Sequence, residues 1–390
     1  VLPIFRIETF ENNGEGEGAA MQDPFALGDD LGPARVIHVH VPSLALKGIL
    51  VVDNVAAGPS IGGLRMAPDV TLEECFRLAR AMTLKNAAAG LPHGGGKSVL
   101  IGDARMPAAE KEKRVRAFAA ALGDERDYIF GPDMGTDEQC MAWVKDEIGR
   151  SVGLPREVGG IPLDEIGATG WGLSFATEIA ARQAGFALKG ARVAVQGFGA
   201  VGLHGARFLA EKGAVLVAAN DSTGTISDPA GLDIAALAAH KKSGRSLRDY
   251  RAGKAGKVDD ILDVECDIWI PAARPDVVRE ENAGRLRTRL VVEGANIPIT
   301  VGAEKALHRR GILVVPDFIA NAGGVICAAM EYAGAPQSAA FDAIAEKISR
   351  NTEEVLAGAA RDGSLPRDAA LDLAVGRVRR AMTTRRFGIF

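Results

Sequence analysis

Short runs of hydrophobic residues alternate with longer segments in which apolar residues recur every three or four positions. The short runs are rich in Val, Ile and Leu and predict buried strands. They lie at 34–41, 48–55, 98–102, 191–196, 214–220, 266–273, 290–296 and 312–317. The longer segments predict helices, and after Gly334 the pattern is helical to the end of the chain. Because strands and helices alternate, we predict a layered α/β fold.

The alternation breaks between Gly149 and Gly160, where Gly and Pro interrupt it, as is typical of a boundary between domains. The segment ENNGEGEGAA near the start of the chain has the composition of a flexible linker. We therefore predict a flexible extension at 1–20, a first domain at 21–165, a second domain with denser βαβ alternation at 166–332, and C-terminal helices at 333–390.

Composition excludes several classes of function. The 390 residues include 46 Lys and Arg against 50 Asp and Glu, a balance that provides no global positive field for nucleic acid. No apolar run approaches the ~20 residues that a membrane helix requires. The four cysteines lie far apart without CxxC spacing, which indicates a reducing compartment and neither zinc nor disulfides. We expect a cytoplasmic protein without a nucleic-acid, membrane or metal partner.

A glycine-rich turn follows the predicted strand at 191–196 and leads directly into a predicted helix. In such a turn the first glycine makes the bend, the second lets the backbone approach a pyrophosphate, and the third lets the helix pack on the strand. The free N–H groups at the helix start then favour an anion. The candidate dinucleotide-binding residues are Gly197, Phe198, Gly199, Ala200, Val201 and Gly202.

Asp221 ends the next predicted strand, where an acidic side chain accepts hydrogen bonds from the adenosine ribose hydroxyls. The same carboxylate repels a 2′-phosphate, so the sequence favours NAD over NADP. NADP is not excluded, because the neutral neighbours Asn220 and Ser222 soften this preference. We include Ser222 among the candidate cofactor-binding residues.

Two lysines and an aspartate are the candidate catalytic groups of the first half. A capping box at Thr71 opens a helix whose apolar stripe includes Lys85, and GLPHGGGK sets Lys97 where a loop enters the next strand. The order of strand and helix is the reverse of a phosphate-binding Walker loop. Burial near a second cation would make Lys97 a usable acid or base, and a substrate carboxylate would fit between the two ammonium groups. Alternatively, Lys85 is solvated and Asp133 only caps a helix.

Seven segments, in order, resemble the glutamate/leucine/phenylalanine/valine dehydrogenase family of amino acid dehydrogenases. They are GGLRMAPDV at 62–70, MTLKNAAAGLPHGGGK at 82–97, GPDMGT at 131–136, ATGWG at 168–172, GFGAVG at 197–202, EGAN at 293–296 and PDFIANAGGV at 316–325. The resemblance implies reversible oxidative deamination of an L-amino acid to a 2-oxo acid and ammonia with NAD(P). It assigns the substrate α-carboxylate to Lys85 and catalysis to Lys97 and Asp133. It assigns nicotinamide contacts to Thr169, Asn296 and Asn321.

The resemblance also implies an architecture. The first domain is expected to bind substrate and form the oligomer, and the second to be a Rossmann-type dinucleotide-binding domain. The C-terminal helices are expected to pack back on the first domain, with the active site between the domains. We expect a homo-oligomer, with a hexamer as the first expectation and an octamer or dimer as alternatives.

Two departures from the family pattern concern the substrate. Glutamate-specific members carry a lysine just before GGLR and a serine three residues after NAGGV, whereas this chain has Ile61 and Ala328. An uncompensated glutamate carboxylate would cost on the order of several kcal/mol to bury there. We therefore predict an apolar substrate side chain, of Leu, Val or Phe type. The candidate substrate-binding residues besides Lys85 are Ile61, Gly62, Gly94, Gly131, Val325 and Ala328.

Two alternatives stay open. One is a glutamate dehydrogenase with an atypical pocket, which agrees with the glutamate-type appearance of EIGATGWG and EGANIPIT. The other is a catalytically silent nucleotide-binding regulatory protein, against which the intact lysines and Asp133 argue. In addition, Ile297 replaces the glycine usual after EGAN, which predicts a slightly different backbone beside the nicotinamide.

Overall fold

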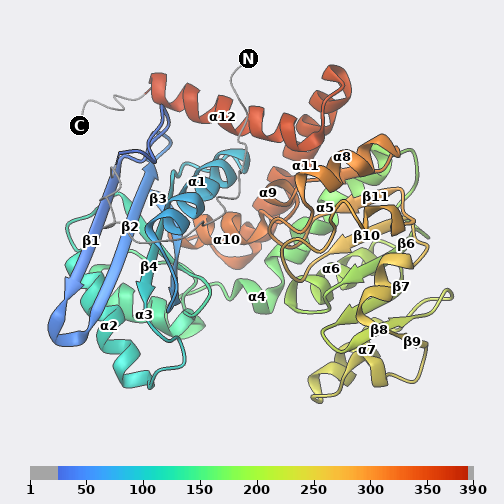
Figure 1. Cartoon of the computed structure of the whole chain (residues 1–390), viewed down its shortest axis with the longest axis horizontal. Coiled ribbons are helices and arrows are strands. Elements are labelled where there is room, and N and C mark those ends of the chain that lie inside the picture. Colours follow the sequence, from blue (N-terminus) through green and yellow to red (C-terminus); the bar gives the residue numbers. More distant parts are fainter. Residues whose placement is uncertain (1–24, 385–390) are drawn as a thin grey trace, which may run out of the picture.

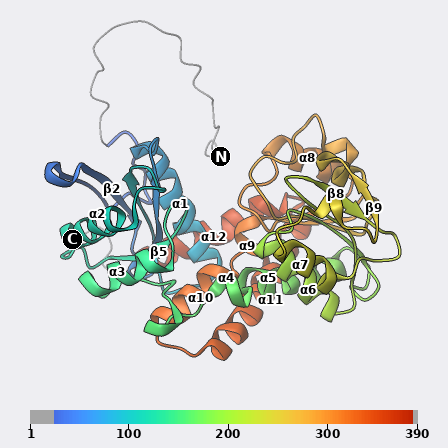
Figure 2. The same cartoon turned by 90° about the horizontal axis from the view of Figure 1, so that it is seen from below.

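The computed structural model describes residues 25–384, which form two lobes, each built around its own sheet (Figure 1). The view from below in Figure 2 shows the same two lobes, with α4, α5, α10 and α11 near the junction. The extension expected at 1–20 lies outside the described residues. The two-domain α/β architecture expected from the sequence is confirmed.

The first lobe holds a mixed five-stranded sheet in the order β1-β2-β4-β3-β5. Strands β3, β4 and β5 are mutually parallel, and β2 and β1 run antiparallel at the other edge. The strands are β1 (Arg35–Val41), β2 (Leu46–Asn54), β3 (Ser60–Ala67), β4 (Gly95–Ile101) and β5 (Tyr128–Pro132). The helices of this lobe are α1 (Leu72–Ala88), α2 (Ala108–Ala121) and α3 (Glu138–Ile148).

Strand β3 was missed by the hydrophobic pattern, because glycines interrupt its apolar run. The glycines are needed where backbones approach closely. A Cβ atom on Gly62 would lie 1.8 Å from the carbonyl oxygen of Gly96 in β4. Strand β4 also begins earlier than predicted, so Lys97 lies within the strand and not in the preceding loop.

Helix α1 begins as the sequence predicted. The Thr71 hydroxyl accepts a hydrogen bond from the Glu74 N–H at 3.1 Å, and the helix packs on β4. Its fully buried face includes Cys75, Ala79 and Thr83. Lys85 is half-buried on the neighbouring face and faces α9 (Asp317–Ala320) across the junction between the lobes.

The second lobe holds a seven-stranded sheet in the order β12-β11-β10-β6-β7-β8-β9, parallel from β12 to β7. The strands are β6 (Arg192–Gln196), β7 (Val215–Asp221), β8 (Gly224–Ser227), β9 (Lys254–Gly256), β10 (Ile268–Pro271), β11 (Leu290–Val292) and β12 (Leu313–Val315). The chain leaves β6 for β7 on one side and later returns to place β10 on the other. Ligands of open α/β sheets bind at such a switch point, at the carboxyl ends of the strands.

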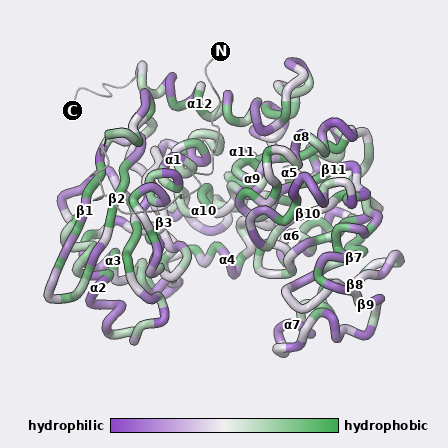
Figure 3. Tube along the Cα trace, in the orientation of Figure 1, coloured by the Kyte–Doolittle hydropathy of each residue, from purple (hydrophilic) through white to green (hydrophobic). Residues whose placement is uncertain are grey.

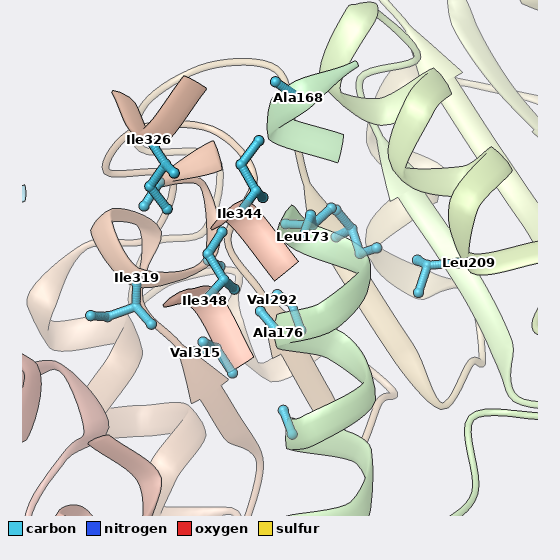
Figure 4. Packing of buried hydrophobic residues seen from close by; sticks show 14 of the residues in the cluster. Ala168, Leu173, Ala176, Leu209, Val292, Val315, Ile319, Ile326, Ile344 and Ile348 are labelled. Carbon is cyan, nitrogen blue, oxygen red and sulfur yellow. The ribbon is translucent and has the colours of Figure 1, made fainter. Parts of the chain in front are cut away.

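The second lobe and the C-terminal segment also contribute helices, several of which pack on this sheet. They are α4 (Leu163–Ile166), α5 (Ala168–Gln183), α6 (Ala200–Glu211), α7 (Ile234–Lys242), α8 (Val301–Arg309), α9, α10 (Gly323–Tyr332), α11 (Gln337–Asp362) and α12 (Pro366–Thr384). Figure 4 shows Leu173 and Ala176 of α5 packed with Ile344 and Ile348 of α11. This apolar core fixes the position of α5, which begins one residue before Thr169.

The last two helices pack on different lobes. Helix α12 packs on α1 of the first lobe, as expected, whereas α11 packs on α5 and α10. The hydropathy of α12 alternates along its length (Figure 3), because Pro366, Ala370, Ala374 and Val378 form one buried stripe. No helix within residues 25–384 is long and apolar enough to cross a membrane.

Candidate active site

Lys97 and Asp133 meet on the first lobe. The Lys97 Nζ and Asp133 Oδ2 atoms are 2.5 Å apart, and the lysine is 6% exposed. Lys97 comes from β4, and Asp133 directly follows β5. Asp133 is not a helix cap, because Asp137 caps α3 by accepting from the Cys140 N–H. The structure therefore brings together the two candidate catalytic residues, which lie 36 positions apart in the sequence.

Strand β3 lies between these two residues, and its glycine leaves room for their contact. A Cβ atom on Gly63 would lie 2.7 Å from the Asp133 Cβ and 3.0 Å from the Lys97 Nζ. Any larger residue would push the ammonium and the carboxylate from their present positions. Gly63 belongs to the GGLR segment, but the sequence alone did not show that the two charges meet beside it.

Arg65 is a member of the site that sequence reasoning missed. Its Nε donates to Asp133 Oδ2 at 3.1 Å, and its Nη1 donates to Glu74 Oε1 at 2.5 Å. Burial alone would raise the pKa of Asp133, but Lys97 and Arg65 hold it below its ordinary value. Asp133 is thus a carboxylate at neutral pH. One sequence signal could have identified Arg65. It stands two residues after Gly63 on the same strand, which puts both residues on the same face of the sheet.

Lys85 is an ammonium in an unfavourable environment. Burial lowers its pKa to about 8; Asp317 of the second lobe opposes this shift, and Lys97 adds to it. The charge of Lys97 therefore acts on Lys85, and the two ammonium groups repel each other. Such a pair favours an anion between them.

The candidate side-chain pocket is apolar. Ile61 and Ala328 belong to one cluster of buried hydrophobic residues, and Val325 packs against that cluster. Ile61 is 3% exposed. The candidate glycines differ: a Cβ on Gly94 would lie 1.7 Å from the Asn54 carbonyl oxygen, whereas one on Gly131 would only touch Val152 at 3.6 Å. Gly94 is thus required by backbone packing, and Gly131 leaves space.

The glycine-rich turn lines a cavity of about 630 Å³ at the carboxyl ends of β6 and β7. Gly197 has φ +92°, the left-handed region that favours glycine. A Cβ on Gly202 would lie 2.0 Å from the Gly197 carbonyl oxygen, so the helix packs closely on the turn. The space beside Gly199 is open. Ala200, Val201 and Gly202 lie in α6 and do not line this cavity.

The acidic residue at the end of β7 is not an isolated carboxylate. Asp221 Oδ1 accepts from the N–H and hydroxyl of Thr223, and its Oδ2 lies 3.6 Å from the Lys241 Nζ. Ser222 and Lys241 line the same cavity as Asp221. Lys241 was missed by the sequence analysis, because it comes from α7, beyond the βαβ unit that carries the glycine turn.

The three candidate nicotinamide residues come from separate segments, and two of them, Asn296 and Asn321, are in contact. The Asn321 Nδ2 donates to the Asn296 Oδ1 at 3.0 Å. Thr169, in the first turn of α5, has its hydroxyl 3.3 Å from the position that a Cβ on Gly324 would take. The substituted position Ile297 keeps a glycine-like backbone, with φ +42°, and its side chain is 55% exposed. The backbone at Ile297 is therefore strained, because a β-branched residue takes a conformation that favours glycine.

These residues fit a dinucleotide. The first turn of α6 has no side-chain cap, so its N–H groups are available to an anion next to the open space at Gly199. Within residues 25–384, the buried atoms Gln196 Oε1 and Asn321 Oδ1 have no hydrogen-bond partner. Gln196 lines the cavity, and Asn321 is a candidate nicotinamide residue. Both are acceptors that a ligand donor would satisfy.

Comparison with known proteins decides the family. The profile of the Glutamate/Leucine/Phenylalanine/Valine dehydrogenase family matches residues 159–386, and that of the Glu/Leu/Phe/Val dehydrogenase dimerisation domain matches 33–150. The chain belongs to this family. It is therefore an amino acid dehydrogenase, and the silent regulatory protein that the sequence left open is not supported.

Relatives of this dehydrogenase cover nearly its whole length. A glutamate dehydrogenase of Aeropyrum pernix is 39% identical, over 85% of each chain. An NADP(+)-dependent glutamate dehydrogenase of Pyrobaculum calidifontis is 38% identical, over 90% of this chain and 91% of the relative. The Leu-bound form of a hetero-hexameric glutamate dehydrogenase from Thermus thermophilus superposes with a TM-score of 0.80 at 30% identity, over 92% and 91%.

Proposed function

We propose that this dehydrogenase catalyses the reversible, NAD(P)-dependent oxidative deamination of an L-amino acid with an apolar side chain. The observation that carries the proposal is that Ile61 and Ala328 both lie buried in one large hydrophobic core, against which Val325 also packs. These are the positions at which glutamate-specific members hold a lysine and a serine. An apolar side chain gains from burial there, whereas a carboxylate would lose its hydration without a counter-charge.

The proposed roles follow from charge and position. Lys85 would bind the substrate α-carboxylate, which relieves the repulsion between Lys85 and Lys97. Asp133, held as a carboxylate by Lys97 and Arg65, would accept a proton from the substrate ammonium group. After loss of hydride from the α-carbon has converted the amine to an imine, Lys97 would take a proton from the water that attacks the imine carbon.

The remaining roles concern the cofactor. Bound nicotinamide would accept the hydride from the α-carbon. Thr169, Asn296 and Asn321 would orient its ring, while the turn at 197–202 would hold the pyrophosphate. We propose that NAD is preferred because Asp221 lines the cavity beside the glycine-rich turn, where its carboxylate would repel the 2′-phosphate of NADP. Lys241, 3.6 Å from that carboxylate, offers partial charge compensation, so we expect measurable binding of NADP as well.

Glutamate is the second candidate substrate. The relatives from Aeropyrum pernix and Pyrobaculum calidifontis are glutamate dehydrogenases, and they share 38–39% identity with this chain. We further propose a homo-oligomer built through the matched dimerisation domain, with a hexamer as the first expectation. A cytoplasmic location is part of the proposal, and the four buried free cysteines are consistent with it.

A panel assay tests the substrate. Formation of reduced nicotinamide would be followed by absorbance with L-leucine, L-valine, L-phenylalanine and L-glutamate, each with NAD and NADP. We expect the highest kcat/KM with an apolar amino acid and NAD. Glutamate as the best substrate would refute the pocket argument and favour the second candidate.

A double substitution sharpens the test. Ile61→Lys with Ala328→Ser should lower kcat/KM for apolar substrates and raise it for glutamate, each by about 10-fold or more, because one paired charge is worth several kcal/mol in a dry pocket. Ile61→Leu is the matched control, and it should change neither by more than about threefold. If a folded double variant showed no increase in kcat/KM for glutamate, residues other than these two would determine the side-chain specificity.

A further inference from the structure

Arg367, near the start of α12, is surrounded by three carboxylates of the second lobe. Its Nε donates to Glu304 Oε1 at 2.6 Å, its Nη1 to Asp317 Oδ1 at 3.0 Å, and its Nη2 to Glu293 Oε2 at 2.7 Å. The Glu293 side chain is 0% exposed and that of Arg367 is 16% exposed. Such a planar fork fixes direction as well as distance, which a lysine in its place would not do.

The Arg367 cluster leads directly to the candidate nicotinamide residues. Asp317 Oδ2 accepts from the Ile297 N–H at 2.8 Å, and Glu293 Oε2 accepts from the Asp317 N–H at 2.8 Å. Asn321 donates its N–H to the Asp317 carbonyl oxygen at 2.7 Å. These hydrogen bonds join the segment 293–297, which follows β11, to the start of α9. The Asn296–Asn321 pair connects the same segment to the end of α9.

The same helix reaches the first lobe. Figure 1 shows α12 running over both lobes. Its Arg377 Nη1 donates to the Ala88 carbonyl oxygen at 2.8 Å, at the end of α1. Helix α1 carries Lys85, whose charge is close to that of Asp317. One helix therefore contacts both the support of the asparagine pair and the helix that holds the carboxylate-binding lysine.

We propose that Arg367 is a positioning residue for the nicotinamide end of the active site. It holds the Asp317 carboxylate so that the second oxygen fixes the Ile297 N–H, and this sets where Asn296 and Asn321 present their amides. The inference rests on the proposed function, because it takes these two asparagines to face the nicotinamide. The cluster has three acidic groups and one arginine, so removing one acid relieves repulsion while it breaks the chain of hydrogen bonds.

Asp317→Asn and Arg367→Gln test this role in the full-length oligomer. We expect Asp317→Asn to keep the melting temperature of the parent, to bind reduced dinucleotide about 10-fold more weakly, and to bind ADP-ribose, which lacks nicotinamide, unchanged. Its kcat should fall about 10²-fold, the effect of misplacing reacting groups by about 1 Å. Arg379→Gln is the matched control on the same helix, since Arg379 is exposed and, among residues 25–384, forms its ion pair with exposed Asp30; it should change none of these values.

Arg367→Gln should give the same pattern with a lower melting temperature, because three carboxylates lose their cation. The double variant should be no worse in kcat than either single variant, since both break one chain of contacts. An Asp317→Asn protein with parental kcat and dinucleotide affinity would overturn the proposal, as would equal weakening of both probes. Dinucleotide affinity is measured without amino acid, so an incorrect substrate assignment leaves these results interpretable.

Discussion

The two lobes build their halves of the site from the same residue, glycine, for opposite reasons. At Gly63 the space beside the backbone is filled by the Lys97–Asp133 ion pair, so a side chain is excluded. At Gly199 the space is open, beside a helix start whose N–H groups have no cap. The first lobe therefore presents charged side chains already paired in the free protein, and the second lobe presents backbone N–H groups without a side-chain partner.

The largest expected effect separates the two lobes by function. Lys97→Ala should lower kcat by about 10³-fold or more, because it removes the group that we propose activates water, while the Kd for reduced dinucleotide stays within about twofold. Steady-state kinetics and fluorescence binding measure the two quantities. Lys47→Ala, at an exposed position of the same lobe, is the control. A large loss of dinucleotide affinity would place Lys97 in the other half of the site.

Alanine at the two glycines tests the contrast directly. Gly63→Ala should lower kcat about 10²-fold and destabilise the fold by ~1–3 kcal/mol, because the added Cβ overlaps Asp133. Gly199→Ala should leave the melting temperature unchanged and weaken dinucleotide binding about 10-fold, because the methyl enters the space that a pyrophosphate needs. Each variant serves as the control of the other. Equal melting temperatures for the two would argue against the crowding at Gly63.

The pH dependence of substrate capture should report Lys85. Its pKa is lowered to about 8 from an ordinary 10.5, so the ammonium is lost as the pH rises through 8. We expect kcat/KM for the amino acid to fall above pH 8, and Lys85→Arg, which stays charged, to lack this limb.

A rise in pH should lower substrate capture through Lys85 but raise the contribution of Lys85 to stability. Between pH 8 and 10.5 the unfolded chain still binds the proton that the native state has released, so the contribution of Lys85 to the free energy of unfolding rises over this window. Denaturant unfolding of the parent and of Lys85→Met at several pH values measures it. A contribution that falls with pH would contradict the lowered pKa.

The smallest expected effect concerns the strained backbone at Ile297. A β-branched residue at φ +42° costs about 1–2 kcal/mol, and glycine would remove that cost while adding about 0.5–1 kcal/mol of chain entropy. Ile297→Gly should therefore raise the free energy of unfolding by at most ~1.5 kcal/mol. Val301→Gly is the control, since Val301 is equally exposed but has no left-handed backbone that glycine would relieve; it should not stabilise the fold. Destabilisation by Ile297→Gly would mean that its side chain makes a needed contact.

Hydrophobic periodicity predicted the strands with continuous apolar runs, such as β6 and β7, and the capped start of α1. It missed β3, where two glycines dilute the pattern, and it put Lys97 in a loop because GGGK precedes the apolar residues of β4. Local sequence signals cannot report a glycine that is required by a neighbouring strand. The residues that support the site, Arg65, Lys241 and Arg367, come from segments distant from the partners they hold.

Sequence alone determined which chemical groups this chain possesses: two lysines and an aspartate in family-like segments, a dinucleotide turn, and apolar residues where a carboxylate-binding pair would stand. Only the tertiary structure decided which charges meet. Lys97 pairs with Asp133 across β3, Asp317 lies near Lys85 across the junction, and Arg367 joins three carboxylates from separate segments. The physical reason is that residue type follows from the local sequence, whereas electrostatic energy depends on distance and burial, which long-range packing sets.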